Sequence, residues 1–503
     1  MKIGEKTQDA LALIVLPLML GATTQAARWQ VPVDEIAKLL AYDGAPDDYF
    51  GRSAAMDGDI AVLGAADDDD NGNESGSAYV FRRDDNGTPY DPRDDSWLCE
   101  DKLLASDGAP ADYFGWSVGV SGDLIVVGAP GDDVAGHMTG SAYVFQHDDN
   151  GTPEDHSDDF WPEVAKLLNP GMTWGDEFGW SVAISGETIA IGAPGDDTAG
   201  NRAGAAWVFY GPNWTPVAQM MASDAAPFDG FGAAVAIDGD ALVIGAPAHD
   251  HNGADCGSAY VFRGPGWIQQ DELQSPGGVP GDHFGASVAI SADTVLIGDG
   301  AHDDGNNGSD SGAAYVFRFD ANTGAWPPEA TLLAWDAGGG NGENDRFGCS
   351  VAVYADTALI GTPEDEDNGM NSGSAYVFWR DDNGTPGNPN DDFWVDIAKL
   401  LASDGGPFDY FGHAVALSGD TGLLGAFGDG DNGSNSGSAY VFARCFADLN
   451  GDGTVGLPDL AQLLSNYGST SGAAYDDGDL DGDGDVDLAD LAALLATYGT
   501  ACL

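Results

Sequence analysis

The sequence of 503 residues is 43% hydrophobic and 10% aromatic, which is enough apolar material for a large core and excludes a globally disordered chain. It carries 83 acidic and 17 basic side chains, so its formal net charge is −66. This charge repels phosphate backbones and anionic lipids, which excludes nucleic acid as a partner, and it attracts cations. Two explanations of the charge stay open: solubility, for example in a salty medium, and the supply of metal ligands.

The N-terminal segment has the anatomy of a secretory signal peptide. Two lysines precede an apolar run over residues 10–22, and Thr24 and Ala26 put small residues at −3 and −1 of a cleavage point. The run is shorter than the roughly 20 apolar residues of a membrane span, and no later stretch is a candidate for one. We therefore expect residues 1–26 to be a signal peptide and the mature protein to be secreted or held at the cell surface.

A short stretch, GSAYVF, recurs along the chain. It begins at residues 76, 140, 257, 373 and 437, with the near copies GAAWVF at 204 and GAAYVF at 312. A Phe-Gly pair precedes each copy, at Phe50, Phe114, Phe178, Phe231, Phe284, Phe347 and Phe411. The spacings between these phenylalanines are 64, 64, 53, 53, 63 and 64 residues. A regular period of this size is typical of a stacked or radial repeat fold.

Each repeat has four apolar runs. The first resembles FGWSVAIS, and a tight turn such as SGD leads to the second, which resembles TIAIGAP. An acidic loop leads to GSAYVF, and a hairpin leads to a fourth run such as WPEVAKLL. Four short antiparallel strands form one blade of a β-propeller. The sequence therefore predicts a mainly β fold, a seven-bladed β-propeller of four-stranded antiparallel blades over residues 27–443.

The fourth strand of the last blade comes from the N-terminus in this prediction. Six tryptophans mark fourth strands, at Trp97, Trp161, Trp214, Trp267, Trp326 and Trp394. The seventh repeat has no such strand, but EIAKLLAYD at 35–43 matches DIAKLLASD at 396–404. We expect a strand near residues 35–41 to pair with the last blade and close the ring, which removes an exposed sheet edge.

These repeats resemble a known family. The FG pair, the GAP tripeptide at 128–130, 192–194 and 245–247, and the aromatic-Val-Phe strand are similar to the FG-GAP repeats of the integrin alpha-subunit propeller. The family often carries a calcium loop, DxNxDG, between the FG and GAP strands. Here that connection is only two or three residues long, as in Ser121-Gly122-Asp123, so the resemblance does not imply that calcium site.

After Phe446 the chain changes to two copies of an acidic, glycine-rich loop, 31 residues apart. Oxygen ligands fall at positions 1, 3, 5, 7 and 12 of each copy, and also at position 9 of the second. The predicted ligands are Asp448, Asn450, Asp452, the Thr454 carbonyl and Asp459, then Asp479, Asp481, Asp483, the Asp485 carbonyl, Asp487 and Asp490. Hard oxygen ligands at this EF-hand-like spacing predict two bound Ca²⁺ ions; the alternative is an acidic linker.

Each loop runs into an amphipathic helix. Four leucines lie on one face of each helix, Leu457, Leu460, Leu463 and Leu464 in the first and Leu488, Leu491, Leu494 and Leu495 in the second. Asp at position 12 and the lack of a helix before each loop resemble a type I dockerin, a calcium-dependent module that docks onto cohesin domains. This implies that residues 444–503 form a small α-helical paired calcium-loop domain that binds a cohesin-like or cell-surface protein.

Two features of this module are not explained by its resemblance to a type I dockerin. Cohesin-binding dockerins usually carry small hydroxyl residues at loop positions 10 and 11, where this sequence has Leu457-Pro458 and Leu488-Ala489. Cys445 and Cys502 stand just outside the two loops, and in an oxidising compartment they would form a disulfide that ties the ends together; the alternative is two free thiols.

A candidate binding rim lies in the acidic loops between the second and third strands. Seven equivalent positions would ring one mouth of the propeller: Asp68, Asp132, Asp196, His249, His302, Asp365 and Asp429. The loops from fourth strands to the next FG open on the same face and bring Tyr49, Tyr113 and Tyr410. Carboxylates with aromatics suit cation-bridged binding of a polymer or protein; alternatively, each Asp caps its own turn.

The sequence has little sign of catalysis. GWSVG at 115–119 matches G-x-S-x-G but lies in a predicted strand, not in a strand–turn–helix elbow. His249-Asp250-His251 could hold a metal or be an ordinary surface loop. We therefore predict a non-catalytic binding or adhesion protein that recognises a protein or polysaccharide. The alternatives are a cellulosome-like component of polysaccharide degradation, which needs a catalytic cluster that is not visible among 17 basic residues, and a structural role in an envelope or matrix.

Overall fold

The computed structural model describes residues 33–86, 95–152, 156–251, 253–303, 310–336, 344–381, 392–444, 447, 449, 455–469, 478, 480 and 485–498. The predicted signal peptide, residues 1–26, and the predicted disulfide between Cys445 and Cys502 lie outside these residues. No helix in the described ranges is long and apolar enough to cross a membrane.

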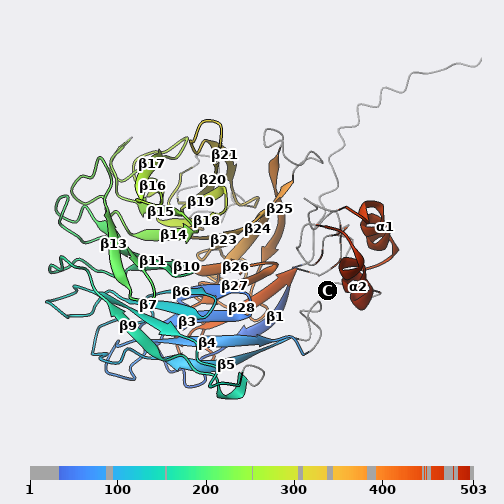
Figure 1. The fold of residues 1–503 in the computed structure, drawn as a ribbon, viewed down its shortest axis with the longest axis horizontal. Coiled ribbons are helices and arrows are strands. Elements are labelled where there is room, and N and C mark those ends of the chain that lie inside the picture. Colours follow the sequence, from blue (N-terminus) through green and yellow to red (C-terminus); the bar gives the residue numbers. More distant parts are fainter. Residues whose placement is uncertain are drawn as a thin grey trace, which may run out of the picture.

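The chain forms seven antiparallel sheets of four strands each, arranged around a common centre (Figure 1). In pairing order, the strands are β2 (Ser53–Asp57), β3 (Ile60–Ala65), β4 (Ser77–Asp84) and β5 (Ser96–Leu103) in blade 1; β6 (Ser117–Ser121), β7 (Leu124–Ala129), β8 (Ser141–Gln146) and β9 (Glu163–Leu167) in blade 2; β10 (Ser181–Ser185), β11 (Thr188–Ala193), β12 (Ala205–Tyr210) and β13 (Thr215–Met220) in blade 3; β14 (Ala234–Asp238), β15 (Ala241–Ala246), β16 (Ser258–Arg263) and β17 (Ile268–Leu273) in blade 4; β18 (Ser287–Ser291), β19 (Thr294–Asp299), β20 (Ala313–Arg318) and β21 (Pro328–Leu332) in blade 5; β22 (Ser350–Tyr354), β23 (Thr357–Thr362), β24 (Ser374–Asp381) and β25 (Phe393–Leu400) in blade 6; and β26 (Ala414–Ser418), β27 (Thr421–Ala426), β28 (Ser438–Arg444) and β1 (Val33–Leu39) in blade 7. The predicted mainly β, seven-bladed propeller of four-stranded blades is confirmed.

The ring closes through β1, which is the outermost strand of blade 7. It pairs antiparallel with β28, with Lys38 opposite Tyr440 and Leu39 opposite Ala439. The first and last parts of the propeller are therefore joined by backbone hydrogen bonds, and blade 7 presents no edge where β28 would otherwise be exposed.

The repeated motifs meet at the boundaries between blades. Phe114, at the start of blade 2, forms an isolated parallel bridge with Gly76, at the start of GSAYVF in blade 1. The same Phe-to-Gly bridge joins every neighbouring pair, including Phe50 with Gly437 across the closure. A Cβ on Gly76 would lie 2.0 Å from the Phe114 carbonyl oxygen, so no larger residue fits. Each boundary thus requires both motifs, which is why both recur seven times.

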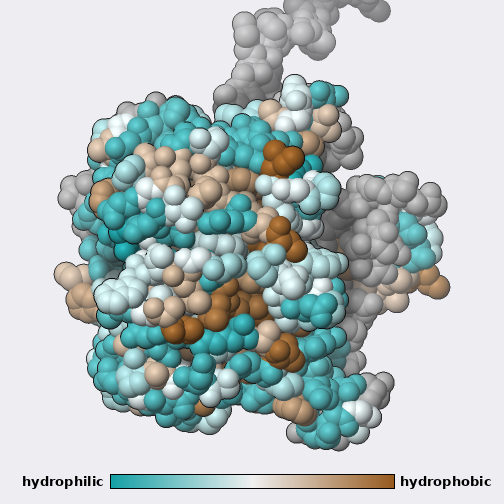
Figure 2. Space-filling view, turned by 60° about the vertical axis from the view of Figure 1, so that its left-hand side comes forward, coloured by the Kyte–Doolittle hydropathy of each residue, from teal (hydrophilic) through white to brown (hydrophobic). Residues whose placement is uncertain are grey.

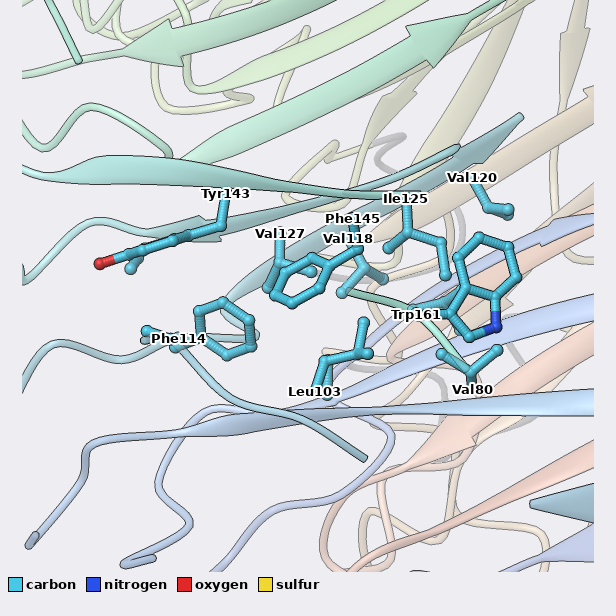
Figure 3. Close-up of a cluster of buried hydrophobic side chains, with 14 of the residues drawn as sticks. Val80, Leu103, Phe114, Val118, Val120, Ile125, Val127, Tyr143, Phe145 and Trp161 are labelled. Carbon is cyan, nitrogen blue, oxygen red and sulfur yellow. The ribbon is translucent and has the colours of Figure 1, made fainter. Parts of the chain in front are cut away.

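The core lies between adjacent blades. In the cluster between blades 1 and 2, Phe114 meets Tyr143 edge to face, with ring centroids 5.4 Å apart, and packs near Leu103 and Val127 (Figure 3). All seven FG phenylalanines are fully buried. Burying one such side chain contributes about 1.5–3 kcal/mol, so no blade retains this stabilisation without its neighbour.

The C-terminal region contains two short helices, α1 (Leu457–Asn466) and α2 (Leu488–Thr497), which share a small apolar core. Leu463 and Leu494 are buried in it, and Leu460 and Leu491 pack against it. The small core covers only part of the predicted leucine faces, and the remaining leucines point to solvent. The exposed leucines are Leu457, Leu464, Leu488 and Leu495.

Candidate binding face and calcium loops

The seven predicted rim positions lie at equivalent places, in the loops that follow the second strand of each blade. Their side chains are largely enclosed: the five aspartates and His249 are 3–7% exposed, and the His302 side chain is 12% exposed. An open ring of solvent-facing carboxylates, as the sequence suggested, is therefore not what these positions form. Their contacts lie within the blades.

In four blades the rim aspartate belongs to what we call a lysine cage, one ammonium group enclosed by carboxylates. In blade 1, Lys102 Nζ lies 2.8 Å from Asp43, 2.9 Å from Asp68 and 2.7 Å from Asp70. Burial alone would lower the pKa of Lys102, but hydrogen bonds with Asp43 and Asp70 outweigh it and raise this pKa well above its ordinary value. The equivalent lysines are Lys38, Lys166 and Lys399.

The tyrosine of GSAYVF completes each cage. The Tyr79 hydroxyl lies 2.7 Å from Asp43 Oδ1 and 3.1 Å from Asp68 Oδ2, and the Ser77 hydroxyl donates to Asp68 at 2.8 Å. Sequence reasoning missed both the lysine and the tyrosine as partners of the rim. The signal was present in three of these four repeats, which combine Asp, Ser-Ala-Tyr and Lys at the same offsets, whereas the lysine of blade 7 comes from the N-terminal strand β1.

A second aspartate recurs two residues before each FG phenylalanine, and sequence reasoning did not single it out. In six blades its carboxylate accepts a hydrogen bond from the backbone N–H three residues earlier, as Asp112 does from Ala109 at 2.7 Å. Burial raises the pKa of Asp48 and Asp112 to about 6. The full set is Asp48, Asp112, Asp176, Asp229, Asp282, Asp345 and Asp409.

Large aromatic side chains are exposed on the face where the rim loops open. They project from the loops that join a fourth strand to the next first strand, and they are 49–75% exposed. These residues are Tyr42, Trp174, Phe228, Trp335 and Phe408. Two of the predicted tyrosines make contacts between neighbouring blades instead, since Tyr113 donates to Glu74 and Tyr410 accepts from Asn371. Viewed from one side, the molecule is mainly hydrophilic, with apolar residues in separate patches (Figure 2).

A second group of aromatics lies beside the FG pairs and at the end of β27. The Arg52 guanidinium lies 4.1 Å from the Trp116 ring, and Trp116 lies 4.8 Å from Trp180. At blade 7, Tyr410 stacks on Phe427 with ring centroids 5.0 Å apart. These half-buried rings lie on the loop side of the propeller and add apolar surface to the same face.

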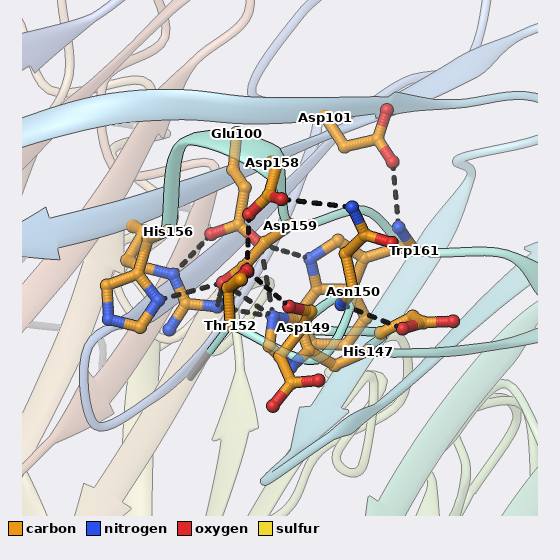
Figure 4. A network of polar contacts seen from close by, with 12 residues as sticks. Glu100, Asp101, His147, Asp149, Asn150, Thr152, His156, Asp158, Asp159 and Trp161 are labelled. Carbon is orange, nitrogen blue, oxygen red and sulfur yellow. Dashed lines mark hydrogen bonds and ion pairs between the residues drawn. The ribbon is translucent and has the colours of Figure 1, made fainter. Parts of the chain in front are cut away.

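A polar cluster lies at the hairpin end of blade 2, on the opposite face (Figure 4). His147 Nε2 and His156 Nδ1 lie 3.0 and 2.8 Å from Asp159 Oδ2. The nearby Glu100 forms an ion pair with Arg82 and accepts a hydrogen bond from Trp161 Nε1. Because a guanidinium already neutralises this cluster, its carboxylates are less suited to hold a metal ion.

The described part of the calcium loops contains four of the predicted ligands. One carboxylate oxygen from each of Asp485, Asp487 and Asp490 lies within 4.8 Å of the others. Asp459 and Asp490 are fully buried and accept hydrogen bonds from the backbone of Gly456 and Asp487 at the helix starts. The ligands outside the described residues are Asp448, Asn450, Asp452, Thr454, Asp479, Asp481 and Asp483. Calcium at these loops stays a prediction.

The seven blades, closed through β1, define the chain as a seven-bladed β-propeller with one loop-built face. A family model described as the FG-GAP repeat matches seven segments, residues 33–81, 97–145, 161–209, 214–262, 267–317, 326–378 and 394–442. These segments span more than half of the sequence, and the chain belongs to the FG-GAP repeat family. The fold of this family suggests a binding or adhesion protein.

Among solved structures, the chain is similar to the crystal structure of RRP9 WD40 repeats, with 10% sequence identity and a TM-score of 0.46. That alignment covers 82% of this chain and 99% of the other. No curated protein sequence matches the chain.

Proposed function

We propose that this chain is a secreted, non-catalytic binding protein whose propeller recognises a protein or polysaccharide through its loop face. The exposed aromatics Tyr42, Trp174, Phe228, Trp335 and Phe408 carry this proposal. Exposed aromatic surface that gathers on one face marks an interaction site, and tryptophan and tyrosine are enriched where binding energy concentrates. The net charge of −66 favours a cationic or cation-bridged ligand.

The contacts of the lysines support a binding role over a site that uses lysine as its catalytic base. Polysaccharides are cleaved either by a pair of carboxylates or by sites in which a Lys, Arg or Tyr side chain acts as acid or base. The four lysines in the described ranges are all enclosed in lysine cages. Their ammonium groups hold buried carboxylates and stay protonated, so they do not supply a general base.

We further propose that residues 444–503 bind two Ca²⁺ ions and dock the protein to a partner or cell surface. The exposed leucines of α1 and α2 support this role, because Leu457 and Leu488, like Leu464 and Leu495, occupy the same places in the two copies. A duplicated apolar surface of this kind would favour a partner with a hydrophobic groove, in place of the hydroxyl contacts usual for dockerins.

One experiment tests the binding proposal directly. Labelled mature protein is applied to an array of polysaccharides and to the immobilised envelope and secreted proteins of the producing cell, in millimolar Ca²⁺ and in chelator. The proposal predicts a retained partner and no change in polysaccharide viscosity or reducing ends. Release of reducing ends would instead establish the alternative, a component of polysaccharide degradation.

A further inference from the structure

Blade 4 departs from the lysine cage in three of its four charged positions. On β17, Glu272 lies opposite Tyr260, at the register that places Lys102 opposite Tyr79 in blade 1. The same register holds Lys38, Lys166 and Lys399 in the other three caged blades. A carboxylate therefore stands where four blades place an ammonium group.

Two of the three positions that surround the ammonium also change in blade 4. Asp43, Asp68 and Asp70 of blade 1 correspond to Asp224, His249 and His251. The Tyr260 hydroxyl lies 3.0 Å from Asp224 Oδ1, as that of Tyr79 does at 2.7 Å from Asp43, so the frame of the cage is kept. Blade 4 thus retains a place built for a cation but carries no lysine to fill it.

The donor atoms of His249, His251 and Glu272 lie within 4.8 Å of one another at this place, and Asp224 lies beside His249. His249 Nε2 lies 3.6 Å from Asp224 Oδ2 and 4.0 Å from Glu272 Oε1, and His251 Nδ1 lies 3.5 Å from Glu272 Oε1. Ligand atoms around a tetrahedral metal with bonds of about 2.0–2.1 Å are about 3.3–3.5 Å apart. A small contraction of the cluster would close it on a metal ion.

The tautomer of His249 also favours a bound cation at this place. This side chain is 7% exposed, and its Nδ1 lies 3.0 Å from Asp229 Oδ2, a buried carboxylate that can only accept a hydrogen bond. The proton of a neutral His249 therefore sits on Nδ1, and the lone pair of Nε2 faces the carboxylates of Asp224 and Glu272. A lone pair directed at two anions is unfavourable, so Nε2 takes up either a proton or a metal ion there, and a carboxylate behind the imidazole is the usual support of a metal-binding histidine.

Glu272 is held in place for the same task. Its Oε1 accepts hydrogen bonds from Ser258 Oγ at 3.1 Å and Gln274 Nε2 at 2.8 Å. In blade 7, the corresponding carboxylates of Asp404, Asp429 and Asp431 hold the Lys38 ammonium at 2.7–2.9 Å. The difference between the blades is the nature of the donors, oxygen alone around the ammonium and nitrogen with oxygen in blade 4.

We propose that Asp224, His249, His251 and Glu272 form a binding site for a divalent transition metal of the Zn²⁺ class. Two imidazoles with carboxylates suit such a metal, whereas Ca²⁺ and Mg²⁺ prefer oxygen ligands alone. The metal takes the structural place of the lysine ammonium. Because His251 is 40% exposed, the site opens to solvent on the loop face, where a ligand could complete the coordination.

The test is a calorimetric titration of the metal-free mature protein with Zn²⁺, in Ca²⁺ sufficient to fill the C-terminal loops. We expect one Zn²⁺ per chain at blade 4, and a Co²⁺ spectrum typical of nitrogen and oxygen ligands. The matched variant is His249→Asp/His251→Asp/Glu272→Lys, which rebuilds the cage of blade 1 and should fold without binding Zn²⁺. The single variant His251→Gln changes an exposed side chain and should weaken binding by at least about tenfold.

Two results would overturn the proposal. One is a wild-type protein that takes up no Zn²⁺ under these conditions, which would mean that His249 fills the cage as an imidazolium. The other is equal Zn²⁺ binding by the wild type and by His251→Gln, which would place the metal elsewhere. His251→Gln keeps the test decisive if the triple variant does not fold.

Discussion

The ammonium of Lys102 lies 2.9 Å from the carboxylate of Asp68, and both side chains are 7% exposed. Replacing Lys102 by Met leaves Asp68 buried without its cation, beside Asp43 and Asp70. We expect the free energy of unfolding to fall by about 3 kcal/mol, since removal of one partner leaves an uncompensated buried charge. Urea unfolding of the mature wild type and of the variant measures this difference in free energy.

The double variant Lys102→Met/Asp68→Asn is the control for this prediction. It removes the stranded charge together with its partner, so it should be more stable than Lys102→Met alone, with a coupling of about 1 kcal/mol or more. A single variant that unfolds at the wild-type urea concentration would show instead that the lysine cage contributes nothing to stability.

Gly76→Ala tests the bridge between blades. Both Gly76 and Gly58 have positive φ, at 81° and 55°, but a Cβ on Gly76 meets the Phe114 backbone while one on Gly58 meets nothing within 4 Å. We expect Gly58→Ala to cost about 1 kcal/mol from backbone conformation alone, and Gly76→Ala to cost clearly more. Equal shifts in the melting temperatures of the two variants would refute the steric role of this contact.

The repeat period made the propeller predictable from sequence, because each boundary needs the same pair, such as Phe114 with Gly76. The function of the rim was not predictable in the same way. In the sequence, nothing distinguishes Asp429 from the other acidic residues of its loop, because its partner Lys38 lies 391 residues away. Only the closure of the ring brings the two together. The burial of the leucines of α1 was not predictable, because helical spacing shows which residues share a face but not how much of that face the small core covers.

Asp299 makes stability depend on pH. It replaces the alanine of the GAP tripeptide, is fully buried, and has a pKa raised to about 9 by burial and by the charge of Asp282. The folded protein therefore keeps the proton up to about pH 9, whereas the unfolded chain releases it near pH 4. The stability linked to Asp299 is therefore fully present below about pH 4, where both states hold the proton. It is lost progressively as the pH rises from 4 towards 9.

Asp299→Ala should remove this dependence. Near pH 4, ionisation of Asp299 should contribute little to the difference in unfolding free energy between the variant and the wild type. Above pH 4, the unfolding free energy of the variant should rise relative to that of the wild type by up to about 1.4 kcal/mol per pH unit. Thermal unfolding at pH 4.5, 6.5 and 8.5 checks this, with Asp420→Ala on an exposed turn as a control that should follow the wild type. A constant difference across the three pH values would contradict the assignment.

The loop face can be tested with two phenylalanines of equal exposure. Phe408 is 49% exposed in the loop before blade 7, on the proposed binding face, and Phe393 is 48% exposed at the start of β25, on the other face. Phe408→Ala should weaken binding to the retained partner by about tenfold or more, since an aromatic anchor contributes more than 1 kcal/mol. Phe393→Ala should bind as the wild type does. Surface plasmon resonance against the immobilised partner measures both; the reverse order of effects would move the binding site to the hairpin side.

The C-terminal loops should bind two Ca²⁺ ions, and Asp490→Ala should bind one. Asp490 is the position 12 ligand of the second loop, and its carboxylate lies within 4.8 Å of oxygens from Asp485 and Asp487. The same carboxylate accepts from the backbone N–H of Asp487 at 2.7 Å, so its loss also weakens the start of α2. Calorimetric titration with Ca²⁺ in zinc-free buffer gives the stoichiometry, and Asp420→Ala, which removes an exposed carboxylate of the propeller, should still bind two. If Asp490→Ala keeps two Ca²⁺ ions, the loop positions assigned from the sequence are wrong; if the wild type binds none, the acidic linker is the correct interpretation of this region.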